Sequence, residues 1–146
     1  MGVLIFPLAA VIARLEGVPE IALVGNAGGL SEALETPPRK TPAVFVLAET
    51  QGGPISFNGT PVQQDRTTAV KFVVWVRNHG GAAKASAEMD AVLAAIDQQM
   101  TGWSPGGDAF SAMQFVANRD EFEYGAALVN QAVFECNWNF SATPIV

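Results

Sequence analysis

The sequence predicts an α+β fold, in which a mostly antiparallel or mixed β-sheet carries two main α-helices and a β-hairpin arm. Three patterns predict this fold. Residues 132–140 alternate between apolar and polar, as a half-buried strand does. Residues 8–15 and 85–100 repeat apolar side chains at helical spacing. An Asn-Gly pair at 58–59 lies between two extended segments and is a strong hairpin signal. At 146 residues, the chain is expected to form one domain, residues 1–146.

The first helix is predicted over residues 8–15. Its apolar side chains recur at the spacing of one buried helix face, at Leu8, Val11, Ile12 and Leu15. Pro7 fits the first turn because that turn needs no backbone N–H, and Gly17 is expected to end the helix. Residues 20–24 are predicted to follow as a short strand.

A glycine-rich loop is predicted over residues 25–29, after which Ser31 is expected to cap a single helical turn through Leu34. Residues 36–42 contain three prolines, which remove backbone donors and bias their neighbours to extended forms. This segment is therefore expected to be irregular. The continuously apolar residues 43–48 are typical of a strand covered on both faces.

A long loop is predicted over residues 51–65, with the hairpin turn of Asn58-Gly59 inside it. The longest strand is predicted to follow over residues 66–78. One of its faces carries Thr68, Val70, Phe72, Val74 and Val76. The other face carries Lys71, Val73, Trp75 and Arg77.

The second main helix is predicted over residues 85–100 and ends at the glycine-rich residues 102–107. Its apolar stripe consists of Ala85, Met89, Val92, Leu93, Ile96 and Met100. Two final strands are predicted at residues 110–117 and 128–140, joined by a polar turn at 118–125. The apolar face of the last strand holds Ala132, Phe134, Cys136, Trp138 and Phe140.

The composition argues against several classes of protein. Hydrophobic residues make up 49% of the chain and charged residues 15%, so few charges cover the surface. We expect Gly, Ser, Thr, Asn and Gln to cover part of it and a partner to cover some apolar area. The net charge is -6 and the eight Lys and Arg residues are scattered apart from Arg39-Lys40, so no direct sequence-specific nucleic-acid binding is expected. The apolar residues 3–12 lack a basic flank and are too short to span a bilayer, so no membrane contact is expected.

No convincing catalytic set is present, so the protein is not expected to be an enzyme. His79 is the only histidine, and its neighbours Gly80-Gly81 favour a solvated loop side chain over a catalytic one. Cys136 is the only cysteine and is predicted to act as a small buried hydrophobic residue, which suits a reducing compartment.

No cofactor or metal ion is expected either. Asp120, Glu121 and Glu123 cluster in one turn but lack the spacing of a calcium-binding loop. The glycines at 25–29 precede a short helical turn, but the Gly-Lys-Ser/Thr of a phosphate-binding loop is missing. Both segments are interpreted as turns.

The order of elements resembles the tail terminator, or tail completion, proteins of long-tailed bacteriophages and prophages (the minor tail protein U-like family). An amphipathic helix and a proline-bearing linker lead to Pro-Ala-Val-Phe-Val-Leu at 42–47. A long strand at 69–77 then leads into the helix at 85–100. The terminal hairpin holds Phe-Glu-Tyr-Gly at 122–125 and Ala-Val-Phe-Glu-Cys-Asn-Trp at 132–138. The resemblance covers nearly the whole chain.

This resemblance implies a structural virion protein that has no enzymatic activity and no cofactor. It implies a ring, usually a hexamer, that sits on the last ring of the tail tube, stops tube polymerisation and offers a surface for the head-side connector. The implied partners are other copies of the chain, the tail tube protein and the head–tail connector protein. The implied location is the head-proximal end of the tail, after assembly in the cytoplasm of the host bacterium.

Three segments are candidate contacts with such partners. The loop at 51–65 is long and rich in glycine, proline and amide side chains, and is a candidate arm. The turn at 119–124 mixes charge with two aromatics, which favour binding if exposed but can also fold back onto the sheet. Trp103 follows the second helix. The candidate contact residues are Phe57, Asn58, Gln63, Gln64, Trp103, Arg119, Phe122 and Tyr124.

Two other functions stay open at this point. A head–tail connector or another neck component would differ from a terminator in ring stoichiometry and in its bound partner. A small α+β ligand-binding module would need a preformed apolar pocket between helix and sheet. An enzyme would have to use His79.

Overall fold

The computed structural model describes residues 5–56, 62–78, 80–119 and 121–142. Within these residues, three α-helices and one short 3₁₀ helix accompany six strands. In chain order the elements are α1 (Leu8–Glu16), β1 (Leu23–Gly25), α2 (Ala27–Glu35), β2 (Ala43–Ser56), β3 (Val62–Arg77), α3 (Ala82–Met100), η1 (Gly107–Ala109), β4 (Gln114–Asn118), β5 (Phe122–Tyr124) and β6 (Ala127–Ala142).

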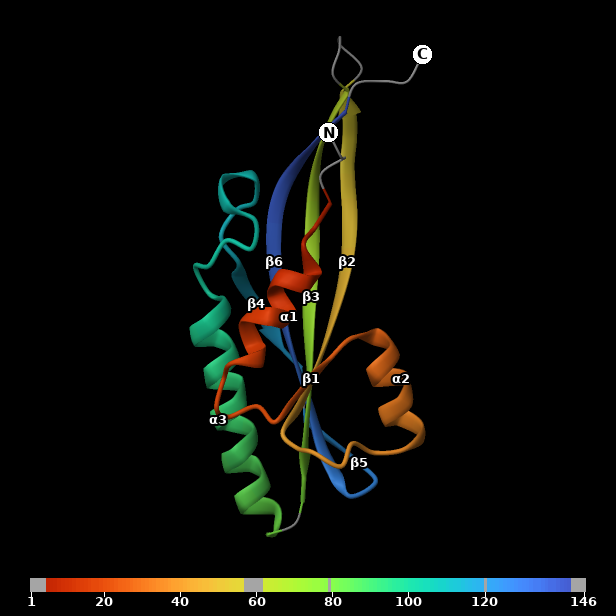
Figure 1. The fold of residues 1–146 in the computed structure, drawn as a ribbon, viewed down its shortest axis with the longest axis vertical. Coiled ribbons are helices and arrows are strands. Elements are labelled where there is room, and N and C mark those ends of the chain that lie inside the picture. Colours follow the sequence, from red (N-terminus) through yellow and green to blue (C-terminus); the bar gives the residue numbers. More distant parts are fainter. Residues whose placement is uncertain (1–4, 57–61, 79, 120, 143–146) are drawn as a thin grey trace.

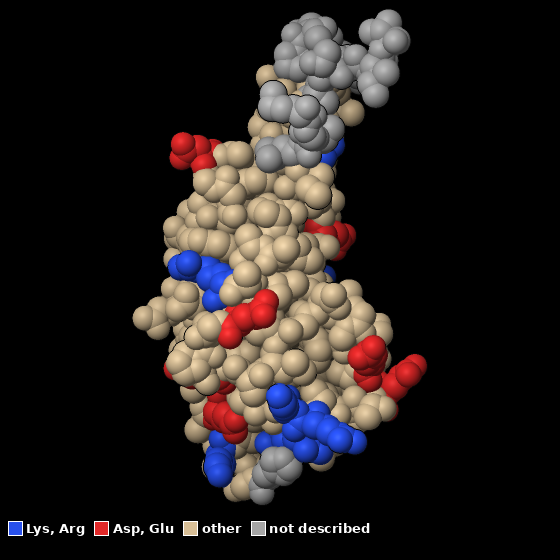
Figure 2. Space-filling view, in the orientation of Figure 1, with Lys and Arg blue, Asp and Glu red and all other residues tan. Residues whose placement is uncertain are grey.

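The strands form one mixed sheet in the order β1-β2-β3-β6-β4, and β5 pairs with β6 beside β4. Only the β1–β2 pair is parallel among the described strands. The molecule is elongated along β2, β3 and β6, whose far ends project past the helices (Figure 1). In the same view uncharged residues cover most of the surface, and a group of Lys and Arg side chains lies at the end away from the projecting strands (Figure 2). The predicted α+β fold class is confirmed.

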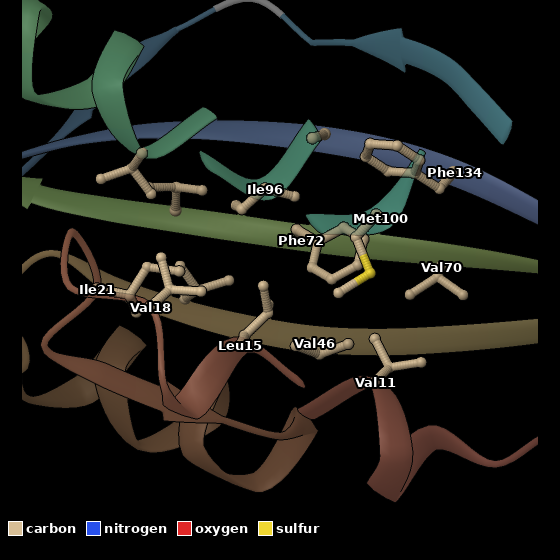
Figure 3. Close-up of a cluster of buried hydrophobic side chains, with 14 of the residues drawn as sticks. Val11, Leu15, Val18, Ile21, Val46, Val70, Phe72, Ile96, Met100 and Phe134 are labelled. Carbon is tan, nitrogen blue, oxygen red and sulfur yellow. The ribbon is translucent and has the colours of Figure 1, made fainter. Parts of the chain in front are cut away.

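Helices α1 and α3 cover one face of the sheet and enclose the main core (Figures 1 and 3). The alternation of β3 and β6 builds this core, because every second side chain of each strand faces the helices. Phe72 and Phe134 meet edge to face with ring centroids 5.5 Å apart. Leu15 of α1 and Ile96 of α3 are fully buried in the same cluster. The predicted helical stripes of both helices are therefore confirmed.

Helix α2 covers the opposite face, but only at the end of the sheet away from the projecting strands (Figure 1). Ala33 of this helix packs in a second buried cluster with Phe45 and Trp75. The rings of Phe45 and Trp75 meet edge to face with centroids 6.4 Å apart. The rest of this sheet face carries no helix among the described residues.

The prediction that residues 25–29 form a loop and that Ser31 caps one helical turn is wrong. Helix α2 begins at Ala27, and the side chain of Asn26 caps it by accepting the N–H of Gly29 at 3.1 Å. Close packing explains why glycines occur at the start of this helix. A Cβ added at Gly29 would lie 3.1 Å from the ring of Phe45, so glycine lets the helix approach the sheet closely.

The prediction of a loop over residues 51–65 is wrong, because both ends of this segment are strands. Strand β2 continues to Ser56 and β3 starts at Val62, and their register runs from Ala43↔Trp75 to Ser56↔Gln63. A register shift between Gly52 and Ile55 accommodates Pro54, which cannot donate to a strand ladder. The predicted Asn-Gly turn at 58–59 lies outside the described residues, between two strands that do pair antiparallel.

Several smaller boundaries also differ from the predictions. The first strand is Leu23–Gly25 rather than residues 20–24, because only this stretch pairs with β2. The strand predicted at 110–117 starts at Gln114, and Phe110 instead makes an isolated bridge to Trp138. The predicted turn at 118–125 contains strand β5, paired with the start of β6.

Candidate assembly surfaces

The far ends of three strands form an arm, made of residues 51–56, 62–67 and 137–142. Register pairs join all three strands, from Gln51↔Thr67↔Asn137 at its base to Gln63↔Ser141 near its tip. Residues 51–56 are exposed, and the arm extends past α1 and α3 (Figure 1). The sequence predicted an arm made of one hairpin, and the structure adds β6 as a third strand.

One face of the arm stacks a cation on aromatic rings. The Arg66 guanidinium lies 3.8 Å from the ring centroid of Phe140 and 5.4 Å from that of Trp138. Its Nε donates to Oε1 of Gln64 at 2.8 Å, and Nε2 of Gln64 donates to the carbonyl of Gly53 at 2.7 Å. Gln64, predicted as a contact residue, is therefore engaged within the arm and helps to align its strands.

The other face of the arm is polar. The Thr67 hydroxyl donates to the Asn137 side chain at 2.8 Å, and Nδ2 of Asn139 donates to the Asp65 carboxylate at 2.9 Å. These cross-strand pairs hold the arm in one register. Gln63 is exposed on this face, as its predicted contact role requires. The predicted contact residues Phe57 and Asn58 lie outside the described residues.

Strand β2 forms an open edge along the arm. Strand β1 pairs only with residues 43–45 of β2, and no other described strand pairs with the outer side of residues 46–56. An open edge presents unpaired backbone groups to other chains. Pro54 and the register shift beside it interrupt that edge near the tip, which limits unselective strand pairing.

The contact residues predicted in the turn at 119–124 lie in different environments in the structure. Phe122 is exposed over 53% of its surface, and Arg119 is exposed as well. Tyr124 instead folds back onto the sheet. Its ring meets Trp75 edge to face at 5.4 Å, and its hydroxyl donates to the carbonyl of Leu34 in α2 at 2.8 Å. Among the described residues, Phe122 and Arg119 are thus free of such contacts, whereas Tyr124 is held by them although 38% of the residue stays exposed.

Trp103, predicted as a contact residue, packs against other residues of its own subunit. It is partly buried against the main core, and the Arg14 guanidinium lies 4.6 Å from its ring centroid. Nε of Arg14 also donates to the carbonyl of Gln99 at 2.7 Å. Since the ring is covered on one side by the core and by Arg14, Trp103 connects α1 to the end of α3.

A groove between α3 and β4 was missed by the sequence predictions. It has a volume of about 480 Å³, and its lining includes Asp90 and Asp97 of α3 and Phe115 of β4. Phe115 is 48% exposed, although its ring also meets Phe134 at 5.6 Å. The apolar residues 110–117 predict a strand, but only the strand order shows that β4 is an edge where such residues stay open.

The described residues offer little for chemistry. Cys136 is buried, and its thiol donates to the Ser111 carbonyl at 3.3 Å. Burial raises the pKa of this thiol above its ordinary value, so it stays protonated and unreactive. Among the described residues, no three His, Cys, Asp or Glu side chains gather as metal ligands. His79 and Asp120 lie outside that part of the chain.

No helix in the described ranges is long and apolar enough to cross a bilayer. The chain matches the family model "Phage tail terminator protein" over residues 1–143. Its fold is similar to a chain of the solved structure "Virion of native gene transfer agent (GTA) particle", with 13% sequence identity and a TM-score of 0.52, covering 93% of this chain and 95% of that chain. No curated protein matches. Because the family model spans nearly every residue, the chain belongs to the phage tail terminator family.

Proposed function

We propose that this structural tail protein assembles into a hexameric ring that caps the tail tube. The ring stops tube polymerisation and provides the surface on which the head-side connector joins the tail. The observation that carries the proposal is the three-stranded arm, taken together with the family. A projecting, internally bonded sheet can reach a neighbouring ring while the helices hold the subunit in place.

The physics of termination sets two requirements. A terminator must match the tube on one side and must lack the tube's own docking face on the other, which is specificity by exclusion. A ring also needs a head-to-tail contact between two different surfaces of each subunit, with a rotation that closes. The polar face of the arm supports the first requirement, because Gln63 and Asn139 offer hydrogen-bond groups in a fixed register.

The two edges of the sheet support the second requirement. One edge consists of β1 and the open length of β2, and the opposite edge consists of β5 and of β4 with its exposed Phe115 and Val116. Two different surfaces on opposite sides of one subunit suit a closed ring of identical chains. The proposed partners are thus other copies of this chain, the tail tube protein and the head–tail connector. The proposed location is the head-proximal end of the tail, reached after assembly in the host cytoplasm.

The test mixes the purified protein with its tail tube protein and images the tubes by negative stain, with the mass of each species measured in parallel. Rings on tube ends and shorter tubes are expected. The arm variant Gln51→Glu/Gln63→Glu should lose capping while it keeps its thermal melt, because the added charges lie on exposed arm positions. The matched control Gln98→Glu changes an exposed residue on α3 and should cap normally.

Different failures have different meanings. Capping by the arm variant at the wild-type level would contradict the role of the arm. Wild-type rings that ignore tubes but bind the head-side connector would favour a neck component instead. A wild-type protein that stays monomeric with and without tubes would contradict the ring.

A further inference from the structure

The groove between α3 and β4 combines an exposed aromatic ring with acidic side chains. Phe115 supplies the ring, while Asp90 and Asp97 supply carboxylates on the α3 side. The Thr101 hydroxyl donates to Asp97 at 2.5 Å, which fixes that carboxylate. Among the described residues that line the groove, none is Lys or Arg. A ligand that suits this lining presents a flat apolar group next to positive charge.

The segment at 36–42 of the same chain has this chemistry. It contains Pro37-Pro38-Arg39-Lys40, in which the one pair of adjacent basic residues directly follows a proline pair. Pro37, Arg39 and Lys40 are exposed. Proline pairs bind aromatic surfaces at low entropic cost because their backbone is already restricted.

The groove and the segment lie at opposite edges of one sheet. The carbonyl of Pro42 accepts the backbone N–H of Ala22 at 2.8 Å, just before β1, which ties the segment to the β1 edge. The groove lies beside β4, at the other end of the strand order. A chain cannot fill its own groove across the width of its sheet, but a neighbouring copy can.

We propose that Pro37–Lys40 of one subunit docks into the Phe115 groove of the next, and that this contact closes the ring. The inference rests on the ring of the proposed function and names the contact between its subunits. Arg39 and Lys40 then face Asp90 and Asp97, and the exposed Pro37 covers the ring of Phe115. Because each subunit uses two different surfaces, the contact repeats head to tail and closes when the rotation allows.

The other charges on the docking side favour the segment over the helix beside it. Glu32 and Glu35 of α2 are exposed near the segment and would repel the aspartates of the groove. Arg39 and Lys40, directly after the prolines, bring the opposite charge to these aspartates. We therefore expect the segment between α2 and β2 to enter the groove and α2 itself to stay outside it.

A mixed-subunit experiment tests the contact. The groove variant Asp90→Lys and the segment variant Arg39→Glu/Lys40→Glu each place like charges across every contact in the ring. Each alone is expected to weaken ring formation at least about tenfold in concentration, measured by sedimentation velocity with or without tail tubes. An equal mixture of the two restores opposite charges when the subunits alternate, so rings are expected to return.

Matched controls are Asp108→Lys and Lys84→Glu, which reverse exposed charges elsewhere and should leave rings intact. Rings formed normally by either docking variant alone would overturn the inference. Folded variants that fail alone and also fail when mixed would overturn it too, because the groove and the segment would then not be partners. Absence of wild-type rings under all of these conditions would instead contradict the proposed function.

Discussion

The indole N–H of Trp138 donates to the hydroxyl of Thr68 over 2.9 Å, in the buried interior where the arm joins the body of the sheet. The same hydroxyl lies 2.8 Å from that of Thr50 on β2. Side chains of all three central strands thus meet at one point. This junction fixes the arm to the core.

Replacement of Thr68 by Val should destabilise the protein by about 1–3 kcal/mol, because the buried Trp138 N–H loses its partner. The double variant Thr68→Val/Trp138→Phe should lose less than the two single costs added together, since neither partner is then left unpaired. Urea unfolding measures both effects. The neighbouring Thr67→Val, whose hydrogen bond is exposed, is the control and should cost less than Thr68→Val. Equal costs at 67 and 68 would contradict the junction.

Asn26→Ala should cost about 0.5–2 kcal/mol, because the Asn26 side chain caps α2. Ser31→Ala should have no such cost, since Ser31 lies inside the helix and is exposed. Thermal or urea unfolding of both variants checks the difference. A larger loss for the Ser31 variant would support the shorter helix that the sequence predicts.

Phe122→Ala should change stability by less than about 0.5 kcal/mol, because Phe122 is 53% exposed. Tyr124→Ala should cost about 1–2 kcal/mol, because it removes the ring contact with Trp75 and the hydrogen bond to α2. If Phe122 contacts a partner, its variant should be folded but defective in tail joining. Normal tail joining by a folded Phe122→Ala protein would remove this residue from the contact surface.

Cys136 should resist thiol reagents until the protein unfolds. Because burial raises the pKa of its thiol in the folded state, the unfolded thiol ionises first as pH rises. The stabilising effect is therefore complete below the unfolded pKa of about 8.5 and is lost as pH rises through the folded value. Urea unfolding across this range should show a steeper loss for the wild type than for Cys136→Ala. Parallel curves would show that the thiol does not contribute.

Much of the fold could be predicted from local periodicity. The alternation of Phe134, Cys136 and Trp138 identifies the buried face of β6, and the helical spacing from Met89 to Met100 identifies the buried face of α3. These patterns work because burial of a strand or helix face follows directly from its repeat. The strand order was not predicted, since it depends on contacts between distant segments.

The arm shows why prediction failed at residues 51–56. Gly52, Gly53 and Pro54 are typical of loops, and only pairing with β3 makes this stretch a strand. The start of α2 was placed too late for a similar reason. Its glycines indicate a loop until the nearby ring of Phe45 is known.

For the candidate contact residues too, some features could be predicted from nearby sequence and others depend on distant residues. The exposure of Gln63 and Phe122 was predictable from polarity and turn signals, although both residues lie in strands. The fold-back of Tyr124 and the stacking of Arg14 on Trp103 depend on partners far along the chain. Phe115 was missed because an apolar strand residue is open only when its strand lies at an edge.

The continuity of β6 has a mechanical consequence. Its 16 residues, at about 3.4 Å each, extend about 54 Å from the hairpin with β5 to the arm. It pairs with β3 in unbroken register from Arg77↔Ala127 to Val62↔Ala142. A pull on the arm along its axis therefore loads these hydrogen bonds in parallel shear instead of opening them one by one. The β3–β6 pair thus resists axial tension along the whole length of the sheet.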